Sequence, residues 1–221
     1  MNHQPPPTGP AGIVGYGTLL SRASLARTVG EGAARRARFL PVRVRGYRRL
    51  FNLRPDHYEP SLHDSSEPIE AAAANLERRE EAHFNGVLFT LDPLALDALH
   101  QRERYYDRVR VQVEPVPSWD SPSEELESNG AEAPPDGFLP TEALIYVGRP
   151  DTPWVEPWLG AGPERLLPLW RDIVLARGAA YRIGPEFGEE YDATTYLADG
   201  STLVAEWYGN ALPDPFDATL P

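Results

Sequence analysis

Glu103 is the residue whose type and position point most directly to chemistry. After the turn signal Asp92-Pro93, Leu96 and Leu99 recur at helical spacing, and Glu103 falls on the same face of the predicted helix. A carboxylate carried into apolar surroundings is disfavoured in its charged form, so its pKa rises and it becomes a better proton acceptor. The spacing therefore provides a candidate general base.

The same glutamate has an ordinary structural interpretation. Sequence patterns are least reliable at the ends of elements, and the helix that carries Glu103 could fray there. The carboxylate would then pair in solvent with a neighbouring arginine, Arg102, Arg104 or Arg108. Periodicity alone favours this interpretation over catalysis.

Missing residue types exclude whole classes of chemistry. The chain has no cysteine, which excludes disulfides, thiolate metal sites and a cysteine nucleophile. The chain also has no lysine, since its 21 lysine-plus-arginine residues are all arginine. This excludes Schiff-base chemistry on lysine and a P-loop lysine. Gly15 and Gly17 follow the first predicted strand, but Leu20 stands where a dinucleotide fingerprint needs its third glycine.

Other arrangements of reactive side chains are weak. His57 and His63 share a predicted loop with acidic residues, but their spacing matches no recognised metal site. Glu103 and Asp107 are four residues apart, as neighbours on one helix would be, whereas glycosidases draw their two carboxylates from opposite sides of a sugar cleft. No serine stands in a nucleophile-elbow context. We therefore expect neither a metal nor a cofactor.

The distribution of charge limits the partners. A formal net charge of -12 argues against attraction to nucleic acid or to an anionic membrane. Eight arginines lie between Arg35 and Arg54, but Val42 and Val44 alternate with arginines there, which indicates a strand with one solvated face. No stretch is long and apolar enough to span a bilayer, and the Pro-rich start lacks the apolar region of a signal peptide. We expect a cytoplasmic protein.

Strands and helices are mixed along the chain. The expected strands are 12–16, 39–51, 70–76, 84–91, 109–113 and 143–147, and the expected helices are a short one capped by Ser21, 94–105, and 163–177 stopped by Gly178. Gly86 lies inside a strand pattern and indicates a bulge or a close backbone approach. This order predicts an α+β fold, with a mixed, largely antiparallel, barrel-like sheet and a few helices.

The length of 221 residues suits a single large domain. We expect a disordered N-terminal tail over residues 1–10, a domain over 11–208 and a C-terminal tail over 209–221. Residues 117–140 contain six acidic residues, several prolines and no arginine, which is typical of a flexible acidic insertion within the domain.

Several motifs, in this order, resemble those of gamma-glutamylcyclotransferase-like proteins. Gly15-Tyr16-Gly17-Thr18-Leu19 resembles the Tyr-Gly-Ser-(Asn)-Leu signature that follows their first strand. Phe84-Asn85-Gly86-Val87-Leu88-Phe89 is similar to their Gly-Val-Leu-Tyr/Phe strand. The segment from Leu96 to Glu103 resembles the helix that ends in their catalytic glutamate. Tyr106-Asp107-Arg108-Val109 is similar to the aromatic residue and arginine that often come after that glutamate.

Two later segments continue the resemblance. Gly178-Ala179-Ala180 and Gly184-Pro185-Glu186-Phe187 resemble the family's Gly-Ala and Gly-Leu-Pro-x-Tyr segments after the last helix. The likeness then covers most of residues 11–195. Thr18 replaces the usual serine, and the insertion 117–140 has no counterpart, so these departures bear on the substrate more than on the fold.

The resemblance implies an activity and a site. A gamma-glutamyl amine would attack its own side-chain carbonyl and release 5-oxoproline and an amine, with Glu103 as general base and acid and without a cofactor. The expected substrate-binding residues are Tyr16, Gly17, Thr18, Leu19, Leu20, Tyr106 and Tyr146. For Tyr106 and Tyr146, a role as ordinary core tyrosines is an equally weighted alternative.

Two functions from other classes stay open at this point. The chain could be a catalytically silent module that binds a gamma-glutamyl or other anionic small ligand in the same pocket. It could also act as an interaction protein through the acidic insertion 117–140. In the enzyme interpretation the partner is a small gamma-glutamyl substrate, with neither nucleic acid nor membrane.

Overall fold

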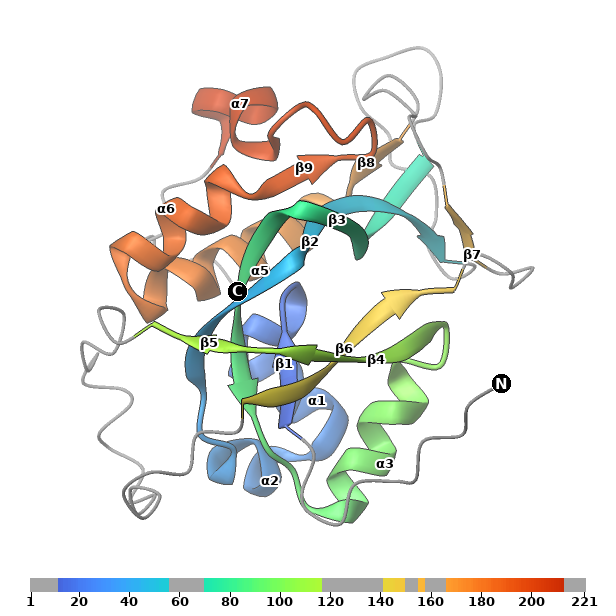
Figure 1. The fold of residues 1–221 in the computed structure, drawn as a ribbon, viewed down its shortest axis with the longest axis vertical. Coiled ribbons are helices and arrows are strands. Elements are labelled where there is room, and N and C mark those ends of the chain that lie inside the picture. The colour runs from blue at the N-terminus through green and yellow to red at the C-terminus, as the bar shows by residue number, and fades with distance from the viewer. Residues whose placement is uncertain (1–11, 56–69, 117–140, 150–154, 158–165, 213–221) are drawn as a thin grey trace.

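The computed structural model describes residues 12–55, 70–116, 141–149, 155–157 and 166–212 (Figure 1). The predicted N-terminal tail 1–10, the acidic insertion 117–140, the loop with His57 and His63, and the end of the predicted C-terminal tail lie outside the described residues. No helix in the described ranges has both the length and the apolar character needed to cross a membrane.

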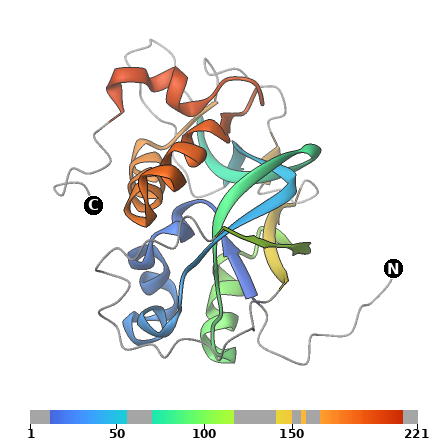
Figure 2. The same ribbon diagram turned by 60° about the vertical axis from the view of Figure 1, so that its left-hand side comes forward.

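A nine-stranded mixed sheet forms the framework of the described residues. Its strands are β1 (Gly12–Gly15), β2 (Leu40–Pro55), β3 (Glu70–Phe89), β4 (Tyr106–Gln112), β5 (Glu114–Pro115), β6 (Glu142–Gly148), β7 (Val155–Pro157), β8 (Leu166–Pro168) and β9 (Thr195–Leu197). The main path is β4-β6-β1-β3-β2-β5, in which only β1 and β6 are parallel neighbours. Figures 1 and 2 show the strong curvature of this sheet, so the predicted α+β fold with a mixed, barrel-like sheet is confirmed.

The helices are α1 (Arg22–Val29), α2 (Glu31–Arg36), α3 (Pro93–Arg102), α5 (Trp170–Ile183), α6 (Pro185–Ala193) and α7 (Val204–Tyr208), with 3-10 turns η1 (Thr18–Leu20) and η3 (Gly209–Ala211). In Figure 2 the blue helices α1 and α2 and the orange helices α5 and α6 lie together on one side of the sheet. Ser21 caps α1 as predicted, since its side chain accepts a hydrogen bond from the Ser24 amide at 3.3 Å. Asp92 caps α3 in the same way through the Ala95 amide at 2.9 Å, with Pro93 at the first helical position.

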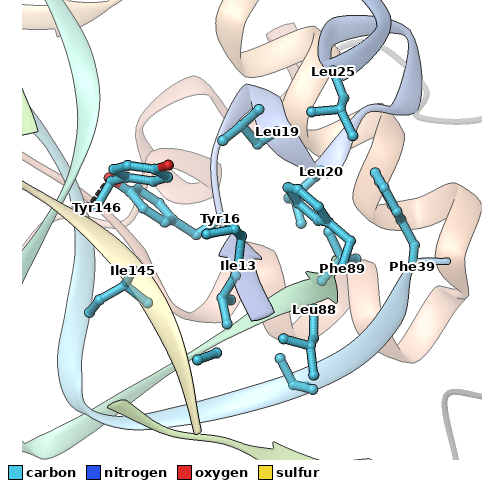
Figure 3. Packing of buried hydrophobic residues seen from close by; sticks show 14 of the residues in the cluster. Ile13, Tyr16, Leu19, Leu20, Leu25, Phe39, Leu88, Phe89, Ile145 and Tyr146 are labelled. Carbon is cyan, nitrogen blue, oxygen red and sulfur yellow. Dashed lines mark hydrogen bonds between the residues drawn. The ribbon is translucent and has the colours of Figure 1, made fainter. Parts of the chain in front are cut away.

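Strand β1 lies at the centre of the core. All four of its residues are buried, and Ile13 and Val14 are wholly inaccessible to solvent. Covering a strand on both faces requires a continuous apolar run, which is what the sequence has there. Figure 3 shows Ile13 beside Leu88 and Phe89 of β3, with Phe39 stacked on Phe89 at a centroid distance of 5.1 Å.

Gly86 is a point of close backbone approach, as predicted. A Cβ atom there would lie 2.6 Å from Val14 Cγ1 and 2.7 Å from the Gly15 carbonyl oxygen. Only glycine lets β3 pair with the end of β1 at this distance.

Two predicted strands, 70–76 and 84–91, fall in the single strand β3, which ends at Phe89, two residues earlier than predicted. A register shift between Arg45 and Tyr47 divides its pairing with β2, and Gly46 lies there with a φ of +83°. Residues 78–81 of β3 are exposed and charged at this irregularity. Because these residues are charged, the pattern of apolar residues is interrupted there, and the sequence predicts two strands instead of one.

The helix predicted over residues 163–177 is wrong at both ends. Leu166–Pro168 is strand β8, α5 begins at Trp170, and Gly178 lies inside α5 rather than after it. The following segment around Phe187, expected after the last helix, forms α6. Glycine inside a helix costs only about 1 kcal/mol, and burial of the neighbouring α5 residues outweighs that.

Candidate active site

The loop after β1 makes one wall of the site. Gly15 must be glycine because a Cβ atom there would lie 2.8 Å from the Leu19 carbonyl oxygen. The chain turns at Gly17, whose carbonyl accepts a hydrogen bond from the Leu20 amide at 2.9 Å, and then enters η1 and α1. A Cβ atom at Gly17 would press on Ala74 of β3 at 3.1 Å, so this glycine allows the loop to lie against the sheet.

Glu103 is the residue that ends helix α3. It does not continue the apolar face of the helix as predicted, because the helical conformation stops at Arg102. The Glu103 amide still donates to the Leu99 carbonyl at 3.0 Å, and the Glu103 carbonyl accepts from the Tyr106 amide at 3.0 Å, so the chain turns directly into β4. The turn carries the side chain inward: only 12% of it is exposed.

Burial shifts the proton affinity of this carboxylate. Desolvation raises the pKa of Glu103, and the nearby charge of Arg102 opposes that rise. Arg102 Nε and Glu103 Oε1 lie 3.0 Å apart. The carboxylate thus pairs with a neighbouring arginine, as the ordinary interpretation expected, but the pair lines a cavity instead of standing in solvent.

A cavity of about 210 Å³ joins the glutamate to the loop. Small-molecule sites of roughly 300–1,000 Å³ are usual, so this one suits a group of amino-acid size. Its lining is Tyr16, Gly17, Thr18, Leu19, Phe51, Leu53, Ala73, Ala74, Arg102, Glu103, Tyr105, Tyr106, Tyr146, Asp172 and Ala176. Residues far apart in the sequence, such as Tyr16 and Asp172, therefore share one cavity.

Several tyrosines line the same cavity as the carboxylate. Tyr16 donates to the Tyr146 carbonyl at 2.7 Å, which Figure 3 marks with a dashed line, and Tyr106 donates to the Ala74 carbonyl at 3.1 Å. The Tyr146 hydroxyl lies 2.8 Å from Nδ1 of His100. Burial, and secondarily the charges of neighbours that include Glu103, raises the pKa of Tyr16 and of Tyr146, so both phenols are neutral at physiological pH.

Seven of the eight predicted site residues meet at this cavity: Tyr16, Gly17, Thr18, Leu19, Glu103, Tyr106 and Tyr146. Leu20 does not line the cavity. Its side chain is 3% exposed within the core, and its amide is used by the turn at Gly17. We therefore do not assign Leu20 a binding role.

Sequence reasoning missed the remaining lining residues. Phe51 and Leu53 come from β2, Ala73 and Ala74 from β3, and Asp172 and Ala176 from α5. These are ordinary strand and helix residues whose position in the wall depends on the sheet topology. The sequence indicates Arg102 only as a solvent partner of Glu103.

Nothing among the described residues forms a metal centre. Clusters of three or more histidine, cysteine, aspartate or glutamate side chains with ligand geometry do not occur in the described ranges. The polar groups that face the cavity include the Arg102–Glu103 pair, tyrosines and main-chain atoms, a set suited to proton transfer and hydrogen bonding.

The fold is shared with known proteins although the sequence is not. No family model matches the chain, and no curated protein matches its sequence. The structure of a gamma-glutamyl cyclotransferase covers 84% of this chain and 88% of its own, with a TM-score of 0.50 and 13% identity. YkqA from Bacillus subtilis covers 89% of this chain with a TM-score of 0.54 and 15% identity, and the match spans 56% of YkqA. The chain therefore has the fold of the gamma-glutamyl cyclotransferases.

Proposed function

We propose that this protein is a gamma-glutamyl cyclotransferase that releases 5-oxoproline from a gamma-glutamyl amide. The observation that carries the proposal is the position of Glu103. A carboxylate with a raised pKa lies in the same small cavity as the loop Gly17-Thr18-Leu19, within the fold of known cyclotransferases. The order of the motifs along the chain supports the same conclusion.

The reaction needs few groups from the protein. Glu103 takes a proton from the α-ammonium group of the glutamyl substrate, and the resulting amine attacks the γ-carbonyl carbon. The ring nitrogen then gives up its second proton, the C–N bond to the leaving amine breaks, and both protons pass, by way of Glu103, to the nitrogen of that amine. The products are 5-oxoproline and a protonated amine, so atoms and charges balance without a cofactor. Because the nucleophile is tethered, holding a bent conformer supplies much of the rate.

The wall residues fit the charges of this substrate. Tyr16 and Tyr106 give their hydroxyl protons to main-chain carbonyls, so their oxygens present lone pairs to other donors such as an ammonium group. Gly17 allows a ligand to approach the main chain of the loop closely, where amide groups would bind the glutamyl carboxylate or the developing oxyanion.

The test is release of 5-oxoproline from gamma-glutamyl dipeptides, gamma-glutamyl amines and glutathione. Glu103→Gln should abolish release while the circular dichroism spectrum and substrate binding by calorimetry persist, because the amide keeps the shape but cannot accept the proton. Glu80→Gln, at an exposed position of β3, is the matched control and should leave release unchanged. Full activity of Glu103→Gln would refute the proposal. Binding by the wild type without release would instead identify a silent binding module.

A further inference from the structure

Arg102 lies between the two halves of the candidate active site, and each of its three nitrogens has a partner within the protein. An arginine side chain has five N–H groups. Its Nε lies 3.0 Å from Glu103 Oε1, and one terminal nitrogen donates to Thr18 Oγ1 at 2.9 Å. The remaining contacts are with α1, namely Thr28 Oγ1 at 3.0 Å, the Ser24 carbonyl at 3.3 Å and Ser24 Oγ at 3.4 Å. The four N–H groups of the two terminal nitrogens therefore have acceptors that the protein itself supplies, and Nε is ion-paired with Glu103.

This arrangement makes Arg102 a poor ligand for a substrate carboxylate, although it lines the cavity. Any new acceptor would have to displace one that the protein already supplies, and only 29% of the side chain is exposed. Its contacts instead join the end of α3 to η1 and α1. They hold one oxygen of Glu103, which leaves the other oxygen of that carboxylate as the proton acceptor.

The charge of Arg102 also distinguishes it from the other groups around Glu103. The phenols of Tyr16 and Tyr146 are uncharged, and the other carboxylate in the lining, Asp172, comes from α5. The charge of Arg108, on β4, favours a lower pKa for Tyr146, but it does not contribute to the pKa shift of Glu103. Arg102 is therefore the cation that opposes the effect of burial on the pKa of Glu103.

We propose that Arg102 is a positioning residue for cyclotransfer: it holds the Glu103 carboxylate and the Thr18 side chain in one arrangement without binding the substrate, and its charge sets the pH at which Glu103 works. The inference rests on the proposed function of Glu103.

Arg102→Gln and Arg102→Lys separate the charge of this residue from its geometry. Glu103 must be ionised to act as a base, so kcat/KM falls as the pH drops through the pKa of Glu103. Removing the cation raises that pKa, so the acidic limb of Arg102→Gln moves to higher pH. Arg102→Lys keeps the positive charge, so the acidic limb of its pH profile should stay near that of the wild type. It lacks the planar guanidinium group that makes several directed hydrogen bonds at once. Its kcat should fall roughly tenfold to a hundredfold while KM changes by less than about twofold.

The matched control is Arg27→Gln, which removes the same charge from α1 away from the cavity lining and should leave the profile unchanged. A large rise in KM with an unmoved acidic limb would make Arg102 a substrate ligand and overturn the inference. If the Arg102 variants lose thermal stability but keep the kcat and the acidic limb of the wild type, Arg102 has only a structural role, and the inference is also overturned.

A readout besides activity keeps this inference separable from the proposed function. The carboxyl carbon of Glu103 can be titrated by carbon-13 NMR in the full chain, with Glu103→Gln to assign the signal. A higher pKa in Arg102→Gln than in Arg27→Gln supports the inference, and equal values overturn it. If the wild type releases no 5-oxoproline, the proposed function fails, yet the titration still decides whether Arg102 sets the charge of Glu103.

Discussion

At the scale of single residues, Arg49 is the buried support of the loop that faces the cavity. Its side chain is 0% exposed, and it donates to the Tyr16 carbonyl at 2.8 Å and to the Asn85 carbonyl at 3.1 Å. Burial lowers the pKa of Arg49 to about 10, so it stays charged at neutral pH. Because a trans peptide points its C=O and N–H in opposite directions, holding the Tyr16 carbonyl also fixes the direction of the Gly17 amide.

Arg49→Met should destabilise the protein by about 2–4 kcal/mol, because the two main-chain carbonyls lose buried donors. Chemical unfolding in urea, with fluorescence and circular dichroism as two probes, measures this change. Arg45→Gln is the control on the same strand: its side chain is 66% exposed and pairs with Glu114 at the surface, so little change is expected. Equal stability of Arg49→Met and the wild type would mean that these hydrogen bonds contribute nothing.

These residues also show what single-sequence reasoning can find. Glu103 and the loop from Gly15 to Leu19 stand in short motifs with a recognisable order, so they could be selected as candidates before the cavity was known. Arg102 and Arg49 carry no comparable signal, because many arginines surround them in the sequence. Their importance comes from acceptors on distant segments, such as Thr18 for Arg102 and Tyr16 for Arg49.

At the scale of elements, local patterns predict the type of most strands but misplace one helix. The apolar run of β1 and the alternation of valine with polar residues in β4 could be recognised because each pattern matches the burial of the side chains. Gly178 is typical of a helix stop, although the chain continues as α5 to Ile183 and ends before Gly184-Pro185. Tertiary packing decides this, because Ala179 and Ala180 are buried beside it.

Two glycines in neighbouring helices should therefore respond oppositely to alanine. Gly178→Ala in α5 should stabilise the protein by about 0.5–1 kcal/mol, because alanine favours a helix and the nearest atom is the flexible Arg182 side chain at 3.5 Å. Gly188→Ala in α6 should destabilise it by about 1–3 kcal/mol, because the new Cβ would lie 2.4 Å from the ring of Tyr181. Thermal unfolding of both variants gives the comparison, and the same sign for both would contradict this packing of α5 on α6.

At the scale of the whole molecule, the site exists only when the sheet is complete. Its walls come from β2, β3, β4 and β6, from the loop after β1 and η1, from the end of α3 and the turn that follows it, and from α5. The fold class could be predicted because it follows from the order of elements. The cavity could not, because its shape depends on which strands become neighbours, such as the parallel pair β1 and β6.

Replacing the insertion 117–140 tests whether the fold and the cavity depend on this connecting segment. The segment joins two ends that the sheet already holds together: the Val113 amide donates to the Thr141 carbonyl at 2.9 Å, and Gln112 pairs with Glu142 in the β4–β6 ladder. Replacing residues 117–140 by a short Gly-Ser linker removes six acidic residues and no arginine, which halves the formal net charge of -12.

Because loop-closure entropy varies slowly with length, the melting temperature of this variant should stay within roughly 4 °C of the wild type. Release of 5-oxoproline should persist, because the cavity is lined by elements of the sheet and by α5. Calorimetry and the release assay measure both quantities. If the variant folds but releases no 5-oxoproline, the insertion takes part in substrate binding or turnover. If release persists but the variant no longer binds a defined partner protein, the insertion is an interaction segment. Retention of both stability and turnover is expected, because the described framework already brings Glu103, Arg102 and Thr18 together.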